Sequence, residues 1–213
     1  MTVTRTLKLC LLTLLFFLTQ LVFANESVTA AAQLSKLLNQ FTTFQAEFTQ
    51  QTFDKNRQLQ QKSTGTVQIM RPGNFRWKTT SPSHQWVITN GTTLWIYDID
   101  LQQVTQQPVD RSPMSPAKLL SGNVDQLLKQ FHVSMQTFKN KVSIFQLIPQ
   151  QSNTDEAFHS VSLIFFGNQL KRIEIQTRLA QINVFSFSQV VMNQPLSPAL
   201  FTFKVPPGVE VLK

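Results

Sequence analysis

The sequence is poor in cysteine and in acidic residues. Its one cysteine is Cys10, and its 11 acidic side chains stand against 19 lysines and arginines, a formal net charge of +8. A basic balance suits nucleic acid, an acidic lipid surface or an acidic protein face, and it can also serve solubility alone. Charge therefore narrows the choice of partner only in combination with location.

The N-terminal segment has the layout of a secretory signal. Arg5 and Lys8 precede an apolar run over residues 9–23, and Ala24 closes a small-x-small cleavage pattern. The apolar run is short for a membrane helix, which needs about 20 residues. The sequence therefore predicts a cleavable signal peptide over residues 1–24.

Cleavage would leave residues 25–213 as a single domain with neither thiol nor disulfide, held together by its core alone. Cys10 does not stand at the end of the apolar run, where the lipid-modified cysteine of a lipoprotein would be. We therefore expect a soluble exported protein. Export argues against nucleic acid as the partner.

Local catalytic signatures are missing as well. His84, His132 and His159 are far apart, and none lies in an H-E-x-x-H or H-x-E pattern. The sequence has no G-x-S-x-G elbow and no glycine-rich phosphate loop. Asp98 and Asp100 flank a turn, but the glycine and distal glutamate of a calcium loop are absent. We predict no catalytic residue, no metal ligand and no cofactor, and hence not an enzyme.

Two short helical regions interrupt a chain of strands. Ser27 is a candidate N-cap for an N-terminal helix whose apolar stripe includes Leu34, Leu37 and Leu38. A central insertion begins with Ser115 as N-cap before a proline, ends its first helix at Gly122, and offers a second helix over residues 124–131.

The rest of the chain alternates apolar and polar residues with the period of two that is typical of half-buried strands. Pro72-Gly73 and Asn90-Gly91 supply turn residues between such strands. About eleven strands follow one another without βαβ alternation, which predicts an antiparallel sheet closed or curled into a barrel. The predicted strands cover residues 44–49, 63–71, 74–80, 85–89, 92–98, 103–109, 133–138, 143–149, 160–166, 170–176, 183–192 and 201–204.

Phenylalanine is abundant, with 18 residues against one tyrosine and three tryptophans. Such residues usually fill an ordinary core. A curled sheet with few helices can also enclose a lipid-sized cavity that its own side chains do not fill. The pattern alone leaves both interpretations open.

Five segments together resemble the LolA family, the periplasmic carriers of outer-membrane lipoproteins. They run in the family's order across essentially the whole mature chain and read FQAEFTQ at 44–50, RPGNFRW at 71–77, NGTTLWIY at 90–97, SPAKLL at 115–120 and FTFKVPPGV at 201–209. The resemblance implies an incomplete antiparallel barrel, mainly β, whose concave face is covered by an N-terminal helix and a central helical insertion. The tail after Val209 is shorter than the C-terminal loop with which some relatives add a strand.

The resemblance also implies roles for individual residues. By itself Arg71 reads as a solvated hairpin corner, but in the family this arginine bonds backbone carbonyls of the lid helices, here near Leu38 and Leu120. Phe75 matches a position that touches the inner-membrane release complex, so it is also a candidate docking residue. The expected cavity lining is Leu34, Leu37, Phe48, Phe75, Trp77, Trp95 and Leu119.

The function implied is that of a periplasmic chaperone, working as a monomer. It would take triacylated lipoproteins from an inner-membrane lipoprotein-releasing ABC transporter and deliver them to an outer-membrane receptor of the LolB kind. Two alternatives remain open: a periplasmic lipid- or lipoprotein-sensing regulator built on the same half-barrel, and a hydrolase acting on lipids.

Overall fold

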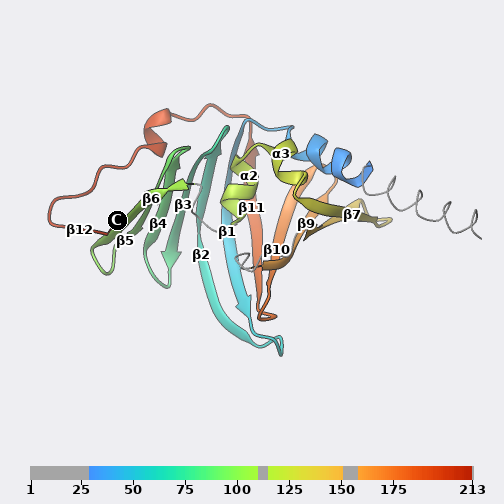
Figure 1. Cartoon of the computed structure of the whole chain (residues 1–213), viewed down its shortest axis with the longest axis horizontal. Coiled ribbons are helices and arrows are strands. Elements are labelled where there is room, and N and C mark those ends of the chain that lie inside the picture. Colours follow the sequence, from blue (N-terminus) through green and yellow to red (C-terminus); the bar gives the residue numbers. More distant parts are fainter. Residues whose placement is uncertain (1–28, 110–114, 151–157, 213) are drawn as a thin grey trace, which may run out of the picture.

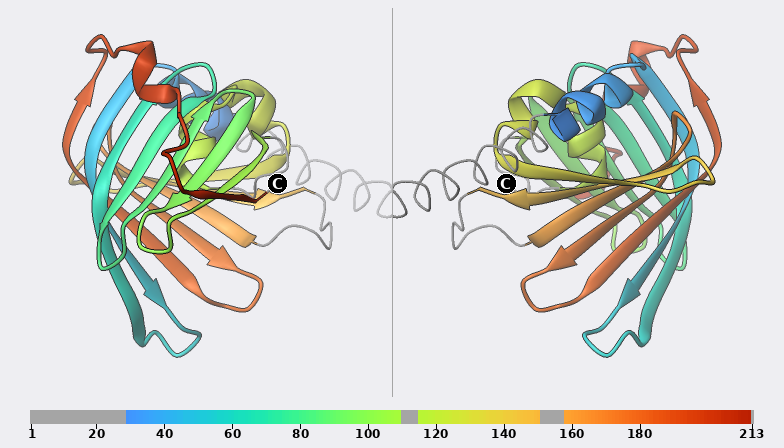
Figure 2. Two further views of the ribbon diagram at one scale, coloured as in Figure 1. Left: turned by 90° about the vertical axis from the view of Figure 1, so that its left-hand side faces the viewer. Right: turned by 90° about the vertical axis from the view of Figure 1, so that its right-hand side faces the viewer.

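The computed structural model describes residues 29–109, 115–150 and 158–212. The predicted signal peptide and the predicted cap at Ser27 lie outside these residues. Within them, the dominant element is one twelve-stranded sheet in the order β12-β6-β5-β4-β3-β2-β1-β11-β10-β9-β8-β7. Figures 1 and 2 show this sheet curled into an open half-barrel, which confirms the predicted incomplete barrel.

Neighbouring strands are antiparallel throughout, except that β12 runs parallel to β6. The strand bounds lie within a few residues of the predicted ones, apart from the C-terminal region. The strands are β1 Thr43–Phe53, β2 Leu59–Met70, β3 Asn74–Ser81, β4 Gln85–Asn90, β5 Thr93–Asp98, β6 Gln103–Pro108, β7 Phe131–Thr137, β8 Val142–Pro149, β9 Phe158–Phe166, β10 Gln169–Thr177, β11 Ile182–Met192 and β12 Glu210–Leu212.

The two predicted turns join β2 to β3 and β4 to β5. Gly73 and Gly91 have φ values of +76° and +90°, which residues with a side chain rarely adopt, so the choice of glycine at each turn follows from the backbone. The turns lie against each other, because a Cβ on Gly73 would stand 3.1 Å from the Cα of Gly91.

Helices cover one face of the sheet. The N-terminal helix occupies residues 29–38 of the described chain, and the central insertion forms α2 (Pro116–Ser121) and α3 (Val124–Leu128). Ser115 caps α2 by accepting a hydrogen bond from the Lys118 amide, as predicted. The prediction that the second helix reaches residue 131 is wrong, because the chain leaves the helix after α3 and Phe131 starts β7.

The main hydrophobic core lies between the concave face of the sheet and these helices, which we call the lid helices (Figure 2). Alternation along each strand sends every second side chain into it. In β3, for example, Phe75 and Trp77 point into the core, whereas Arg76 and Lys78 lie on the outer face over the Trp86 ring, 5.0 and 4.3 Å from its centroid.

The C-terminal segment builds a second, smaller core on the outer face. After β11 the chain forms the 3₁₀ helix η2 (Pro198–Phe201) and returns along the outer side of the sheet to β12 at its edge (Figure 1). Phe201 is fully buried, and Phe203 packs on Trp95 and Tyr97 with ring centroids 6.3 and 5.6 Å apart.

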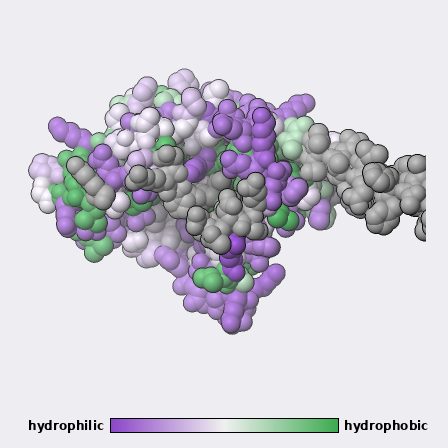
Figure 3. Space-filling model, in the orientation of Figure 1, coloured by the Kyte–Doolittle hydropathy of each residue, from purple (hydrophilic) through white to green (hydrophobic). Residues whose placement is uncertain are grey.

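The prediction of a last strand over residues 201–204 is therefore wrong. Phe201 and Phe203 alternate as in a strand, but they pack onto side chains of the sheet. The short tail, in contrast, does add a strand, β12. The surface seen in Figure 3 is mostly hydrophilic, with hydrophobic residues gathered at the left-hand edge, where β5, β6 and β12 lie.

Candidate functional site

The β2–β3 corner is tied to two lid helices by one side chain, that of Arg71. Its Nε donates a hydrogen bond to the Leu120 carbonyl of α2 (2.7 Å), and its Nη1 donates to the Leu38 carbonyl of the N-terminal helix (2.7 Å). Nη1 also donates to Asn39 Oδ1 at 3.2 Å. The sequence-based expectation that Arg71 faces Leu38 and Leu120 matches this geometry.

Both carbonyls belong to the last turn of their helices. Carbonyls there have no partner within the helix, and the helix dipole places partial negative charge on them. A guanidinium offers five N–H donors on a rigid plane, so it can serve two such helix ends at once. A lysine could offer its charge at only one point.

The guanidinium is held in an apolar environment. Its central carbon lies 4.3 Å from the centroid of the Phe41 ring. Burial lowers the pKa of Arg71 from its ordinary value to about 10, so the side chain stays charged at neutral pH. Nη2 is buried and has no hydrogen-bond partner within the described chain, which leaves two of the five donors unused.

Further contacts join the same elements. The Gly73 amide donates to the Ser121 carbonyl at the end of α2, 2.8 Å away. Ser35 of the N-terminal helix donates to a carboxylate oxygen of Asp125 in α3, which links the lid helices to each other. Sequence reasoning missed these contacts, since no pattern brings Ser35 and Asp125 together across ninety residues.

Most of the predicted cavity residues belong to the core between the lid helices and the concave face of the sheet. Leu34, Phe48, Phe75, Trp77 and Leu119 belong to the core on the concave face, and Leu37 packs against it partly buried. Phe75 is only 3% exposed, so in this conformation it presents no surface to a docking partner.

Trp95 is not among them, and its assignment to the cavity is wrong. Its neighbours in β5, Leu94 and Ile96, face the main core, so Trp95 faces the opposite side, where it packs on Phe203. The alternation of side chains along β5 correctly puts Trp95 on the face opposite to Leu94 and Ile96. It does not show which of the two faces is concave, because both faces of β5 are apolar.

An aromatic cluster forms the centre of the concave face. The Trp77 ring lies 4.3 Å from Phe48, 5.7 Å from Phe185 and 6.4 Å from Phe187, measured between centroids. Phe185 and Phe187 come from β11 and were not singled out from the sequence, although their spacing of two residues in a strand places them on one face.

A cavity of about 190 Å³ adjoins this cluster beneath the start of α2. Pocket volumes for small-molecule ligands usually run from about 300 to 1,000 Å³. This space by itself is thus too small for acyl chains, and displacement of α2 would enlarge it. Its lining consists of Gln50, Phe75, Trp77, Thr79, Gln85, Val87, Ser115, Pro116, Ala117 and Phe185.

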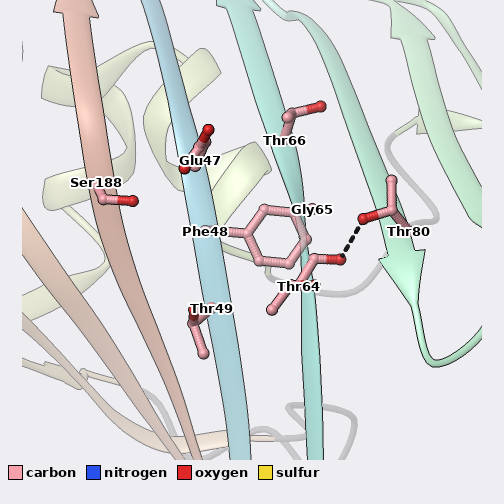
Figure 4. Close-up of a pocket in the computed structure, with 8 residues that line it drawn as sticks. All are labelled: Glu47, Phe48, Thr49, Thr64, Gly65, Thr66, Thr80 and Ser188. Atoms are coloured by element: carbon pink, nitrogen blue, oxygen red, sulfur yellow. Dashed lines mark hydrogen bonds between the residues drawn. The ribbon is translucent and has the colours of Figure 1, made fainter.

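A second hollow, of about 270 Å³, lies over β1, β2 and β11 (Figure 4). Hydroxyl groups and one carboxylate dominate its lining, and Thr80 donates to the Thr64 carbonyl at 3.2 Å. Its polar lining does not suit acyl chains. The residues that line it are Glu47, Phe48, Thr49, Thr64, Gly65, Thr66, Thr80 and Ser188.

Reactive groups do not gather at either hollow. His84 pairs with Asp100 at 3.1 Å, and that contact belongs to an exposed turn. Across residues 29–109, 115–150 and 158–212, no cluster of three or more His, Cys, Asp or Glu side chains is arranged to hold a metal ion. Over the same ranges, no helix is both long and apolar enough to cross a bilayer.

An open sheet with an apolar concave face, covered by helices that one arginine ties to the sheet, defines a lidded half-barrel. The sequence profile described as outer membrane lipoprotein carrier protein LolA matches residues 39–204. The chain belongs to the LolA family.

Relatives in this family cover nearly the whole chain. An outer-membrane lipoprotein carrier protein of Coxiella burnetii is 43% identical over 200 residues, 93% of each chain. Proteins with the same description from Legionella pneumophila and Pseudomonas paraeruginosa are 37% and 35% identical, and cover 93% and 92% of this chain and 98% and 92% of their own length.

Solved structures share the fold at low sequence identity. A LolA superfamily protein of Nitrosomonas europaea is 12% identical, with a TM-score of 0.50 over 84% of this chain and 98% of its own. MucB is 13% identical, with a TM-score of 0.52 over 86% of this chain and 66% of its own.

Proposed function

We propose that the protein is a periplasmic chaperone that binds the acyl chains of lipoproteins released from the inner membrane and delivers them to an outer-membrane receptor. Membership of the LolA family and the similarity to outer-membrane lipoprotein carrier proteins at 35–43% identity support this function. The observation that carries it is the bonding of Arg71 to both lid helices above an apolar concave face.

The physical need for such a carrier follows from the cargo. Each methylene removed from water contributes about 0.8 kcal/mol. Three acyl chains of roughly sixteen carbons would therefore cost some tens of kcal/mol in bare water, so free diffusion between membranes is excluded. The carrier must also release its load, which requires an affinity close to that of the next acceptor.

Arg71 is suited to set that balance. Loading requires the lid helices to move apart from the sheet, and this movement breaks the bonds of Arg71 to the Leu38 and Leu120 carbonyls. The broken bonds subtract from the affinity for cargo, since a ligand that binds only the open form must first populate it. Reformation of these bonds favours release to the receptor.

The remaining parts of the proposal concern location and partners. Residues 1–24 are a signal peptide that is removed on export, and residues 25–213 act in the periplasm as a monomeric carrier without catalysis. Cargo arrives as triacylated lipoprotein from the releasing ABC transporter. Phe75 is buried beneath the lid, so it would meet that transporter only in the open form.

A release assay tests the function. Purified mature protein is incubated with spheroplasts that carry a labelled triacylated lipoprotein in the inner membrane, and the label is followed into the soluble fraction. A carrier brings the lipoprotein into solution in a one-to-one complex. If the label stays with the spheroplasts at saturating protein, the proposal is wrong.

A sensing regulator is the second candidate, and the fold shared with MucB is what favours it. That likeness shows the architecture alone, and this chain matches 66% of the MucB chain. The carriers are matched over more than nine tenths of their length at higher identity, which favours transport. Co-purification of the protein from cells with an anti-sigma factor would support the regulator instead.

A further inference from the structure

Two turns at the β7 end of the sheet form one corner. The Phe138 amide donates to the Val142 carbonyl, and the Gly167 amide donates to the Lys141 carbonyl, both at 2.8 Å. Val142 of β8 pairs with Phe166 of β9. Phe138, directly after β7, is therefore aligned with Val142 of β8 and Phe166 of β9, and the three residues form one row.

This row lies on the outer face, away from the lid helices. The adjacent residue Phe165 points into the main core, so Phe166 points outward. Phe138 is 47% exposed and Phe166 is 52% exposed. Half-buried Ile144 and Ile164, which pair with each other, continue the apolar strip toward the middle of the strands.

Exposed lysines stand near the two rings in the chain. Lys139 and Lys141 occupy the β7–β8 turn, and Lys171 lies near the start of β10. Within the described chain none of the three forms an ion pair with a carboxylate, and Glu174 of β10 is already paired with Arg172. We call Phe138, Phe166, Lys139, Lys141 and Lys171 the aromatic–lysine corner.

We propose that the aromatic–lysine corner docks the protein on the surface of an anionic phospholipid bilayer. Aromatic rings beside lysines are the composition of interfacial membrane contacts, in which rings enter the headgroup boundary and ammonium groups meet anionic lipid. The two rings project from turns at the end of the sheet, so they reach a flat surface together. A protein partner would instead favour a recessed or well-defined complementary patch, with charged residues depleted at its centre.

This docking goes beyond the carrier function and does not depend on cargo. It would keep the protein at the surface of a membrane from which, or to which, an acyl chain moves. Because the corner is on the outer face, docking leaves the bonds of Arg71 to the lid helices unaltered.

Vesicle sedimentation with the unloaded mature protein tests the proposal. Vesicles of phosphatidylcholine with phosphatidylglycerol should sediment the protein, vesicles of phosphatidylcholine alone should not, and added salt should weaken binding. Reversing three charges (Lys139→Glu, Lys141→Glu, Lys171→Glu) should lower the partition coefficient at least about tenfold. The double variant Phe138→Ser with Phe166→Ser should lower the partition coefficient at both low and high salt.

Matched controls alter exposed residues elsewhere. Lys55→Glu, Lys62→Glu and Lys204→Glu reverse three charges outside the corner, and Leu101→Ser removes an apolar side chain that is 71% exposed. Thermal melting checks that every variant is folded. Equal loss of binding in the controls would show a non-specific effect of net charge and would overturn the proposal.

Two further results would also overturn it. One is wild-type protein that remains in the supernatant with anionic vesicles. The other is a corner variant that binds vesicles normally but takes up lipoprotein from spheroplasts more slowly, which would assign the corner to a protein partner. Failure of vesicle binding alone leaves the carrier function standing, because the spheroplast assay measures that function separately.

Discussion

Replacement of Arg71 by leucine should open the lid helices while the sheet stays folded. Leucine fills much of the space of the side-chain stem but donates no hydrogen bond. The Leu38 and Leu120 carbonyls then lose the donors that now lie 2.7 Å away. The strands of the β2–β3 hairpin keep their own ladder of bonds, so the corner itself should persist.

The size of the effect follows from two opposing quantities. Two hydrogen bonds from a charged donor contribute about 3 to 6 kcal/mol together. Burial lowers the pKa of Arg71 from its ordinary value to about 10, which corresponds to about 3 kcal/mol of lost hydration, and solvent screening reduces this cost to about 2 kcal/mol. The net contribution to lid closure is about 1 to 4 kcal/mol, or about five- to several-hundredfold in the opening equilibrium.

Native-state hydrogen exchange measures this equilibrium amide by amide. In Arg71→Leu, amides of residues 29–38 and 116–128 should exchange faster by at least about fivefold, while amides of β1 and β2 keep their protection. Arg76→Leu is the matched control. Arg76 lies in the next strand on the outer face and donates to the Leu200 carbonyl at 3.3 Å, not to a lid helix.

Unchanged exchange of the lid amides in Arg71→Leu, or the same acceleration in Arg76→Leu, would refute the assigned role. The functional consequence is equally specific. Arg71→Leu should still take lipoprotein from spheroplasts, because the apolar face is intact, but it should pass its load to outer membranes more slowly. Normal transfer by this variant would remove Arg71 from the mechanism.

Other predictions concern stability and pH. Gly65→Ala should lower the Tm by about 10 °C, because the new Cβ would stand 1.9 Å from the Lys78 carbonyl oxygen. Gly208→Ala places its Cβ where no atom lies within 4 Å, so it should cost only about 1 to 2 kcal/mol of stability. Equal melting temperatures of the two variants would contradict this. Phe201→Ala should lower the free energy of unfolding in denaturant by about 3 to 5 kcal/mol, because Phe201 is buried. It should not speed hydrogen exchange of the lid-helix amides. Faster exchange there, as expected for Arg71→Leu, would show that the two cores are not independent. Burial lowers the pKa of Arg71, so the folded protein loses this proton at a lower pH than the unfolded chain does. The buried charge therefore costs folding free energy at every pH below about 10, and this cost is relieved only above that pH. The difference in lid exchange between wild type and Arg71→Leu should thus stay constant from about pH 5 to 9, and a change within that window would indicate another titrating group.

Most of the sheet could be predicted, because alternation of apolar and polar residues marks its strands and glycine, proline and asparagine mark its turns. Asn90-Gly91 and Pro72-Gly73 marked two hairpins whose glycines do adopt positive φ. The C-terminal region failed for a physical reason. Phe201 and Phe203 have the spacing of a strand, but that spacing also arises when an extended segment lays side chains on a sheet without pairing with it.

The candidate site was predictable only in part. Arg71 reads as an ordinary hairpin corner in the residue pattern, and only the family resemblance pointed it toward Leu38 and Leu120. The Ser35–Asp125 contact depends on how helices from opposite ends of the chain settle on the sheet, which no local pattern encodes. Trp95 was placed on the wrong face because β5 is apolar on both sides.

The hydrophobic cluster around Phe201 and Tyr97 separates two tasks within one chain. A carrier that repeatedly binds and releases its cargo cannot depend on the cargo, or on the lid helices that move, to remain folded. Here the outer face of the sheet has its own packing contacts, because Phe201 is buried there and Phe203 packs on Tyr97, away from the concave face. The concave face can therefore exchange its own apolar contacts for those of an acyl chain without loss of the contacts on the outer face.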